Sequence, residues 1–317
     1  MTRPDRPFDI AAARVALVLN AASGKRNAES KEDEIRRAVE PHVRSFSTYS
    51  VRKGHAIVKA TQMAVRDGAD VVVALGGDGT QSAVAGVLAG GSCVMAVLPG
   101  GTFNYFARGL GVGETLDQAI RTLLTGRPRE IDLGEVNGHI FLNNASFGIY
   151  PEILEHREAI YRQWGRSRIA AYWSVLVALR DLRDPMHLTL TVGNQTRDFY
   201  TPLAFAARSP FQLEALGLDG ADAVRDGHFA LFLAKGTSRL TLMAAAVRLA
   251  LGRVSRGQEF DMLTADDILI ETSQPTRLVA FDGEKTRLTS PFRLTMHRAA
   301  LPVIVPQDAN LKGGAAG

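Results

Sequence analysis

The apolar run that ends in a glycine-rich acidic loop is the feature that most constrains this fold. Asp70-Val71-Val72-Val73-Ala74-Leu75 leads directly into Gly76-Gly77-Asp78-Gly79-Thr80. β-Branched residues favour a strand, and glycines let backbone N–H groups approach an anion closely. A carboxylate repels phosphate, so Asp78 suits Mg²⁺ binding or the positioning of an attacking hydroxyl. The pattern predicts a buried strand, a phosphate-handling loop and a helix over Gln81–Ala89; the alternative is an ordinary tight turn.

The first 130 residues alternate between strand-like and helix-like segments. Expected strands are Arg14–Leu19, Arg44–Ser50, Val71–Leu75 and Cys93–Leu98; further expected helices are Glu29–Val39, His55–Arg66 and Thr115–Leu124. This alternation predicts a parallel sheet with helices on both faces. Ligands of such sheets bind beyond the carboxyl ends of the strands. Three Gly- or Ser-rich loops, Asn20–Lys25, Gly76–Thr80 and Pro99–Asn104, are expected at that edge.

After Arg129 short strand-like runs dominate and predict a mostly antiparallel second domain. The expected strands are Ile131–Val136, His139–Ala145, His187–Val192, Thr201–Ala207, His228–Ala234, Asp267–Thr272, Arg277–Phe281 and Phe292–His297. Two helices are expected between them, over Glu152–Leu182 and Arg239–Leu251.

Composition is that of a globular protein, with 46% hydrophobic and 22% charged residues. The single cysteine, Cys93, fits a reducing compartment and is expected in the core. The most apolar charge-free stretch, Ile169–Leu179, is about half of the roughly 20 residues that a spanning helix needs. With no signal-peptide pattern at the N-terminus, we expect a cytoplasmic protein that does not cross the membrane. The net charge of +4 gives weak support to an anionic partner such as a nucleotide or a membrane surface, and nucleic acid is not expected.

The loops, in this order, resemble the diacylglycerol kinase catalytic-domain family, especially its soluble bacterial lipid kinases. The resemblance covers roughly Arg14–Val305. Its motifs are Asn20-x-x-Ser23-Gly24, Gly76-Gly77-Asp78-Gly79-Thr80, Leu98-Pro99-Gly100-Gly101-Thr102-x-Asn104-x-Phe106-Ala107, Ile131-Asp132-Leu133-Gly134, Asp226-Gly227 and Asp282-Gly283-Glu284. Sphingosine and ceramide kinases share the domain, and NAD kinases are more distant relatives.

The resemblance implies a Rossmann-like parallel α/β nucleotide-binding domain over residues 1–132, followed by a mostly antiparallel β-sandwich lipid-substrate domain over residues 133–297. Residues 298–317 would return to the first domain. The implied activity is ATP-dependent transfer of the γ-phosphate to a lipid hydroxyl, with diacylglycerol giving phosphatidic acid.

The resemblance also implies roles for individual residues. The implied ATP-binding residues are Asn20, Ser23, Gly24, Ser50, Gly76, Gly77, Asp78, Gly79, Thr80 and Thr102. The acids Asp78, Asp132 and Glu284 would form the active-site network, with Glu284 as base. A structural Mg²⁺ would be held by Ala223, Asp226 and His228.

Simpler roles stay open for two of these acids. Phe281-Asp282-Gly283-Glu284 is also the pattern of an ordinary D-G hairpin turn. Asp132 alone would suit a capping or solvated residue near a strand.

Two positions depart from the family pattern. Ala21 stands where the first loop commonly has proline, and Tyr105 stands where many members have aspartate. The second departure leaves the acceptor open between diacylglycerol and a ceramide or sphingoid base. An NAD kinase, whose second motif usually differs from Pro99–Asn104, and a non-catalytic nucleotide- or lipid-binding protein remain alternatives.

Residues Ala159–Arg180 combine four arginines with both tryptophans and contain no acidic residue. Tryptophan, tyrosine and arginine together suit the headgroup zone of a bilayer. One hypothesis is that this segment docks at the inner membrane face and guides lipid to the site. The alternative is a helix that packs its aromatic side chains on the second domain. A homodimer is also plausible.

Overall fold

The computed structural model describes residues 8–21, 28–52, 54–148, 185–235 and 260–309. The chain divides into two compact units. Unit 1 comprises residues 1–131 and 299–314, and unit 2 comprises residues 132–298 and 315–317. The expected division was at residues 132/133 and 297/298. The functions expected of the two domains stay predictions.

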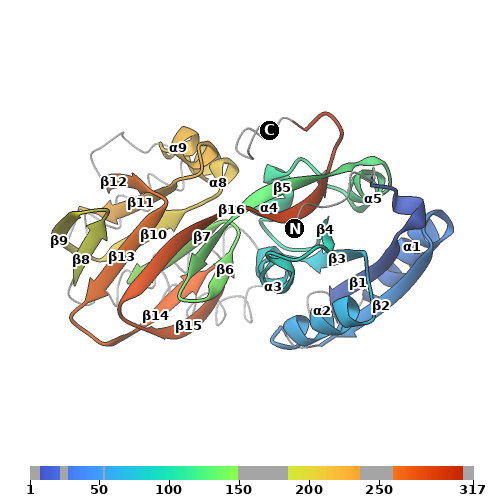
Figure 1. Ribbon diagram of the computed structural model, residues 1–317, viewed down its shortest axis with the longest axis horizontal. Helices are drawn as coiled ribbons and strands as arrows, with labels where there is room; N and C mark the ends of the chain where they lie inside the picture. Colours follow the sequence, from blue (N-terminus) through green and yellow to red (C-terminus); the bar gives the residue numbers. More distant parts are fainter. Residues whose placement is uncertain (1–7, 22–27, 53, 149–184, 236–259, 310–317) are drawn as a thin grey trace. The chain divides into compact units, whose positions relative to one another are not determined.

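Unit 1 alternates strands and helices along the chain (Figure 1). Its strands are β1 (Arg14–Asn20), β2 (Ser45–Val51), β3 (Val71–Gly76) and β4 (Val94–Pro99), joined by the ends of β5 (Arg127–Val136) and β16 (Phe292–Val305). Its α-helices are α1 (Ala28–Val39), α2 (Ala56–Arg66), α3 (Asp78–Leu88), α4 (Tyr105–Gly109) and α5 (Leu116–Thr125). Short 3-10 turns lie at Ile10–Ala12 and Glu40–His42.

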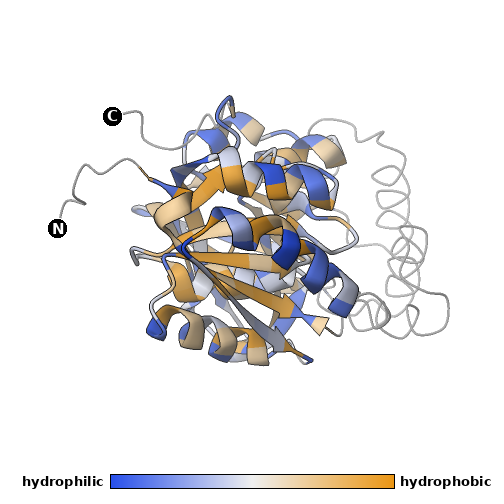
Figure 2. Cartoon of the chain, turned by 90° about the vertical axis from the view of Figure 1, so that its right-hand side faces the viewer, coloured by the Kyte–Doolittle hydropathy of each residue, from blue (hydrophilic) through white to orange (hydrophobic). Residues whose placement is uncertain are grey.

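The unit 1 sheet is parallel and has the order β2-β1-β3-β4-β16. One face packs against α1 and α5, which contribute buried residues such as Ile35 and Leu123 to the same core as Leu17 and Val73. Helices α2 and α3 contact each other and the strands β1 and β3. The strands are mainly hydrophobic in Figure 2, and the helices carry hydrophilic residues as well. The predicted parallel α/β architecture is confirmed.

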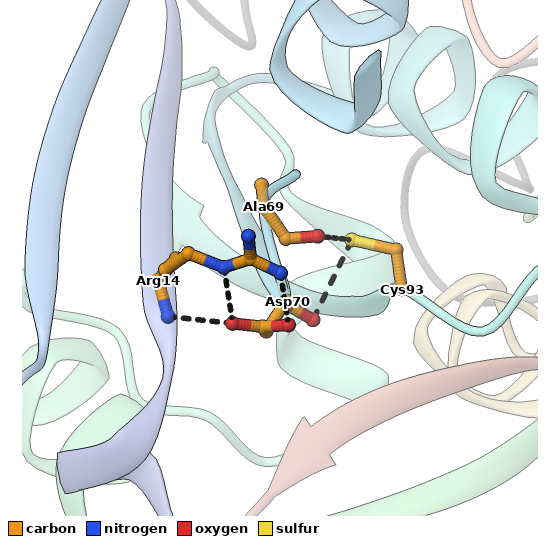
Figure 3. Close-up of polar contacts among 4 residues, drawn as sticks. All are labelled: Arg14, Ala69, Asp70 and Cys93. Atoms are coloured by element: carbon orange, nitrogen blue, oxygen red, sulfur yellow. Dashed lines mark hydrogen bonds and ion pairs between the residues drawn. The ribbon is translucent and has the colours of Figure 1, made fainter. Parts of the chain in front are cut away.

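A surface ion pair fastens β1 to the start of β3 (Figure 3). Asp70 Oδ2 accepts from Arg14 N at 2.9 Å and from Arg14 Nε at 3.0 Å, and its Oδ1 accepts from Nη2 at 3.0 Å. These hydrogen bonds to Arg14 lower the pKa of the Asp70 carboxyl. Beside the pair, Cys93 Sγ lies 3.4 Å from the Ala69 carbonyl oxygen and is buried, as predicted for the cysteine.

The predicted helix after β3 begins earlier than expected. Asp78, Gly79 and Thr80 belong to the first turn of α3, whereas the sequence pattern placed the helix start at Gln81. Gly77 is the N-cap with extended backbone (φ −82°, ψ −178°). An acidic residue directly after the cap is favoured by the positive end of the helix dipole. The short helix α4 was not predicted.

Unit 2 contains antiparallel strands and two short described helices (Figure 1). One sheet has the order β12-β11-β10-β7-β14-β15. The strands of the other sheet have the order β16-β13-β8-β9. Strand β5 also pairs with β16, and β6 pairs with β5. The strands are β6 (His139–Phe141), β7 (Asn144–Gly148), β8 (Met186–Val192), β9 (Gln195–Thr201), β10 (Leu203–Ala207), β11 (Phe229–Ala234), β12 (Phe260–Ala265), β13 (Asp267–Thr272), β14 (Thr276–Phe281) and β15 (Glu284–Thr289); the helices are α8 (Pro210–Leu216) and α9 (Ala221–Arg225).

The two sheets of unit 2 share one hydrophobic core. Phe147 from β7 and Leu231 from β11 lie in the same buried cluster as Leu188 from β8 and Ile270 from β13. The rings of Phe147 and Phe292 have centroids 5.1 Å apart. Two sheets around one core form the predicted β-sandwich.

Three sequence interpretations in unit 2 are corrected. His139–Ala145 was expected as one strand, but β6 ends at Phe141 and β7 begins at Asn144, in different sheets. Thr201–Ala207 is likewise divided at Pro202, which has no N–H for a continuous ladder. Strands β9, β12 and β15 were not predicted because their exposed positions carry polar residues. The expected helices Glu152–Leu182 and Arg239–Leu251 lie outside the described residues.

Within the described residues, no helix is both long enough and apolar enough to cross a membrane.

Candidate functional site

The carboxyl ends of the unit 1 strands lie in register at one edge of the sheet. Asn20 pairs with Val51, Leu19 with Ser50, and Gly76 with Pro99. The sheet thus brings together the predicted ATP-binding residues at the ends of β1, β2 and β3. Ser23 and Gly24, which were predicted for the first loop, lie outside the described residues.

The loops after β3 and β4 pack against each other through glycine backbones. A Cβ atom on Gly101 would lie 2.5 Å from the Cα of Gly77, and one on Gly100 would lie 3.1 Å from the Cα of Gly76. Gly100 N donates to the Gly76 carbonyl at 3.0 Å. The paired loops therefore have no room for a side chain at residue 101, and their peptide groups lie directly beside the start of α3.

Asp78 joins the first turn of α3 to the start of α4. Its Oδ1 accepts from Phe106 N at 3.0 Å. This bond satisfies a backbone donor at the start of α4, where N–H groups lack partners within the helix. Asp78 therefore fixes the second glycine loop to the first, in addition to any role toward a cation.

Two amide side chains, Asn104 and Gln81, hold the loops in place. Asn104 has left-handed backbone (φ 51°), accepts from Gly101 N at 2.8 Å and donates to the Gly101 carbonyl at 3.0 Å. The fully buried Gln81 donates through Nε2 to the Gly76 carbonyl at 2.9 Å. The sequence interpretation missed Gln81, and a lone glutamine among the small residues of α3 is the only signal that could have indicated it.

Thr102 lies exposed in the second loop, between Gly101 and the aromatic residue Phe103. The Phe103 ring stacks on Tyr105, with centroids 5.4 Å apart and planes 4° apart. Tyr105 therefore places an aromatic ring beside the glycine loops, at the position where the family pattern has an acid.

In unit 2, Asp132 lies buried on β5, with 5% of its surface exposed. Arg208 Nη2 donates to the Asp132 carbonyl, and Arg208 Nη1 donates to the Leu142 carbonyl at 3.4 Å. Burial lowers the pKa of Arg208, and the charges of Asp132 and Asp282 oppose that shift. The buried setting with a cationic neighbour differs from the capping or solvated aspartate that was the alternative for Asp132.

Glu284 lies at the start of β15, just after the turn from β14. It is exposed and pairs with Phe281 across the hairpin. Asp282 and Gly283 form the turn with φ 49° and 87°, so both central residues are left-handed, as in a type I′ turn. The D-G hairpin that was the alternative for this motif is therefore present. It does not decide the role of Glu284, because a carboxylate after a rigid turn is held in a defined position.

Asp282 was not singled out from the sequence, yet its buried carboxylate accepts three backbone hydrogen bonds. It accepts from Leu142 N, Asn143 N and Asn144 N at 2.5, 2.8 and 3.2 Å. Asp282 and Leu142 are 140 positions apart in the sequence, so no local pattern could indicate this contact.

Of the residues predicted to hold a structural Mg²⁺, Ala223 lies in α9, and Asp226 and His228 follow that helix in unit 2. The Ala223 carbonyl accepts from His228 N at 3.0 Å, and the Asp226 carbonyl accepts from Arg298 Nη1 at 3.2 Å. A carbonyl oxygen has a second lone pair, and the Asp226 side chain is exposed. The oxygen donors are of the kind Mg²⁺ takes, so the set fits the ion chemically, although the guanidinium of Arg298 lies against the same loop. Within the described residues, no group of three His, Cys, Asp or Glu side chains could hold a metal.

The predicted acids therefore divide between the units. Asp78 lies in unit 1, while Asp132 and Glu284 lie in unit 2. Unit 1 offers paired glycine loops at the start of a helix, which suit the phosphates of a nucleotide. Unit 2 offers carboxylates that suit proton transfer.

Comparison with known proteins shows which family part of the chain resembles. Residues 14–136 match the family described as "Diacylglycerol kinase catalytic domain". The chain is 33% identical over 144 residues to the "Diacylglycerol kinase" of Bacillus subtilis, covering 44% of this chain and 47% of that protein. It is 42% identical over 97 residues to the "Probable lipid kinase YegS-like" of Pseudomonas aeruginosa, covering 30% and 32%. The match thus spans about half the length, or less, of these curated relatives.

A solved structure extends the likeness to the fold of nearly the whole chain. The crystal structure of a diacylglycerol kinase from Bacillus anthracis superposes with a TM-score of 0.71. The superposition covers 92% of this chain and 97% of that one at 20% sequence identity. At this identity the likeness establishes the fold alone.

Proposed function

Because residues 14–136 match the diacylglycerol kinase catalytic domain, we propose that the chain is an ATP-dependent lipid kinase. The proposed reaction transfers the γ-phosphate of ATP to the free hydroxyl of diacylglycerol and yields phosphatidic acid. The observation that carries the proposal is the backbone contact between Gly77 and Gly101 at the start of α3. Such a side-chain-free cradle suits a polyphosphate more than any uncharged ligand.

Unit 1 would bind the nucleotide. The backbone of Gly76–Thr80 would hold the phosphates at the positive end of α3, and Asn20, Ser50 and Thr102 would contact the rest of the nucleotide from neighbouring loops. ATP would enter with Mg²⁺ as part of the substrate, and that ion would neutralise phosphate charge. Asp78 supports this site by fixing the second glycine loop through Phe106 N.

Unit 2 would supply the acids that act on the lipid hydroxyl. The hydroxyl oxygen forms a bond to the γ-phosphorus, and the bond from that phosphorus to the β,γ-bridging oxygen breaks, so that ADP leaves. The hydroxyl proton passes to a carboxylate, for which Glu284 is our candidate because it is exposed beside a rigid turn. Asp132 would orient the acceptor or act near the Mg²⁺.

Peripheral membrane contact through residues 159–180, a homodimer and a cytoplasmic location stay predictions. The segment 159–180 lies outside the described residues. A structural Mg²⁺ at Ala223, Asp226 and His228 is also part of the proposal, as a support for unit 2.

The experiment is transfer of label from [γ-³²P]ATP with Mg²⁺, separated by thin-layer chromatography. Diacylglycerol, ceramide, sphingosine and NAD serve as acceptors. Labelled phosphatidic acid supports the proposal, a labelled sphingolipid would replace the acceptor, and labelled NADP would overturn the lipid assignment. Glu284→Gln should abolish the product, whereas Glu271→Gln, a matched change at an exposed glutamate on β13, should not. If the protein binds ATP but labels none of the four acceptors, the proposed phosphate transfer to these acceptors is wrong.

A further inference from the structure

A buried charged cluster in unit 2 joins the two motifs that contain Asp132 and Glu284. It consists of Asp132 on β5, Arg208 before α8 and Asp282 in the turn between β14 and β15. Asp132 and Asp282 are 5% and 6% exposed. Two buried carboxylates with one guanidinium are costly to bury, and apolar residues of similar size usually stabilise a fold as well or better. The cost suggests that this cluster has a role beyond stability.

Asp282 holds the turn through both its side chain and its backbone. Its carboxylate accepts from Leu142 N, Asn143 N and Asn144 N, and its own N–H donates to the Asn144 carbonyl at 3.2 Å. The left-handed backbone of Asp282 (φ 49°) is unusual for a residue with a side chain. These four bonds hold it there, and they define where the chain emerges at Glu284, two residues later.

Arg208 holds the same segment from another direction. Its backbone N–H donates to the Asn143 carbonyl at 2.7 Å. Its guanidinium donates to the carbonyls of Leu142 and Asp132. Among the described residues, Asp132 and Asp282 are the charged groups whose fields act on Arg208. Segment 142–144 therefore lies between the Asp282 carboxylate, which binds its N–H groups, and Arg208, whose guanidinium binds the Leu142 carbonyl and whose backbone N–H binds the Asn143 carbonyl.

We propose that Asp282 and Arg208 are positioning residues for phosphoryl transfer, a role that rests on the kinase function proposed above. Asp282 fixes the turn that carries Glu284. Arg208 binds the carbonyls of Asp132, Leu142 and Asn143 and so holds the segment to which that turn is hydrogen-bonded. Neither residue needs to touch ATP. Their effect should therefore fall on the chemical step rather than on nucleotide binding.

The main variant is Asp282→Asn. Asparagine keeps the shape of the side chain but has only one oxygen acceptor. Its NH₂ group, a hydrogen-bond donor, would face at least one of the three backbone N–H groups, which are also donors. We expect kcat to fall about 10- to 100-fold, because a displacement of about 1 Å in a reacting group costs up to about 10²-fold. The KM for ATP should stay within about twofold of wild type. Asp267→Asn is the matched control, since it changes a half-exposed aspartate paired with Arg293.

Arg208 is tested with Arg208→Lys and Arg208→Met. Lysine retains the positive charge, so kcat of the Arg208→Lys enzyme should be about tenfold or more higher than kcat of the Arg208→Met enzyme. A merely structural role would lower the amount of folded enzyme and leave kcat per folded molecule equal in Arg208→Lys, Arg208→Met and wild type.

Amide hydrogen exchange gives a readout that does not depend on kinase activity. Asp282→Asn should increase exchange at residues 142–144 and 282–284 while Asp267→Asn does not. Absence of phosphate transfer by wild type would refute the proposed function, and the exchange pattern would still decide whether Asp282 positions the turn. The inference is overturned if Asp282→Asn matches Asp267→Asn in exchange, or if an active Asp282→Asn enzyme retains wild-type kcat. It is also overturned if kcat falls only in proportion to the folded fraction.

Discussion

Replacing Gly101 with alanine tests the paired glycine loops of unit 1. A Cβ on residue 101 would lie 2.5 Å from the Cα of Gly77 and 2.9 Å from Asn104 Oδ1. Carbon atoms in van der Waals contact lie about 3.5–4.0 Å apart. The loops would therefore have to separate by about 1 Å, and the hydrogen bonds of Asn104 to Gly101 would have to lengthen or break.

The size of the effect follows from that displacement. Overpacking of a close contact costs about 1–3 kcal/mol of stability. A shift of about 1 Å in a group that positions the phosphates costs up to about 10²-fold in rate. Gly77→Ala should be milder, because a Cβ there would meet its nearest atom, the Cα of Gly101, at 3.1 Å.

Urea unfolding and initial rates at varied ATP concentration measure both effects. Gly54→Ala is the control, because a Cβ at this exposed glycine meets no heavy atom within 4 Å. We expect kcat/KM for ATP to decrease in the order Gly54→Ala, Gly77→Ala, Gly101→Ala. A Gly101→Ala enzyme with the stability and kcat/KM of the Gly54→Ala control would refute the account of the loops.

Two further predictions concern the stability of unit 1. Asp70→Asn should lower the free energy of unfolding by about 1 kcal/mol above about pH 5, since its bonds to Arg14 are exposed. The lowered pKa of Asp70 means that the carboxylate stabilises the fold only while ionised, so the difference should vanish as the pH falls through that pKa. Urea titrations from pH 2.5 to 7 measure it, and a difference independent of pH would contradict the assignment. Thr115→Ala should cost about 1 kcal/mol, because Thr115 and Gln118 form a capping box at α5, and Thr115→Ser should cost less than half as much; equal losses would show that the hydroxyl is not the cause.

The sequence predicted the features that depend on neighbouring residues. The β-branched residues in the run from Val71 to Leu75 predicted strand β3, and the glycines after it predicted the loop. The alternation of strand-like and helix-like segments in the first 130 residues predicted the parallel sheet. It therefore also predicted the sheet edge at which Asn20, Ser50 and Gly76 lie.

Features set by distant contacts escaped prediction. The expected strand His139–Ala145 is divided because Asp282 binds the amides of residues 142–144, and nothing local signals an acceptor 140 residues away. Arg208 was missed for the same reason, since its partners come from β5 and segment 142–144. Asp78 was recognised as part of the site, but its bond to Phe106 N depends on how two separate loops pack.

The measurement that tests the central claim most directly is ³¹P NMR of the protein with ATP, Mg²⁺ and diacylglycerol in detergent micelles. The account predicts that ADP and a lipid phosphomonoester resonance grow at equal rates, and that EDTA stops both. Inorganic phosphate appearing with ADP and no phosphomonoester, or ATP remaining intact while bound, would contradict phosphoryl transfer to diacylglycerol.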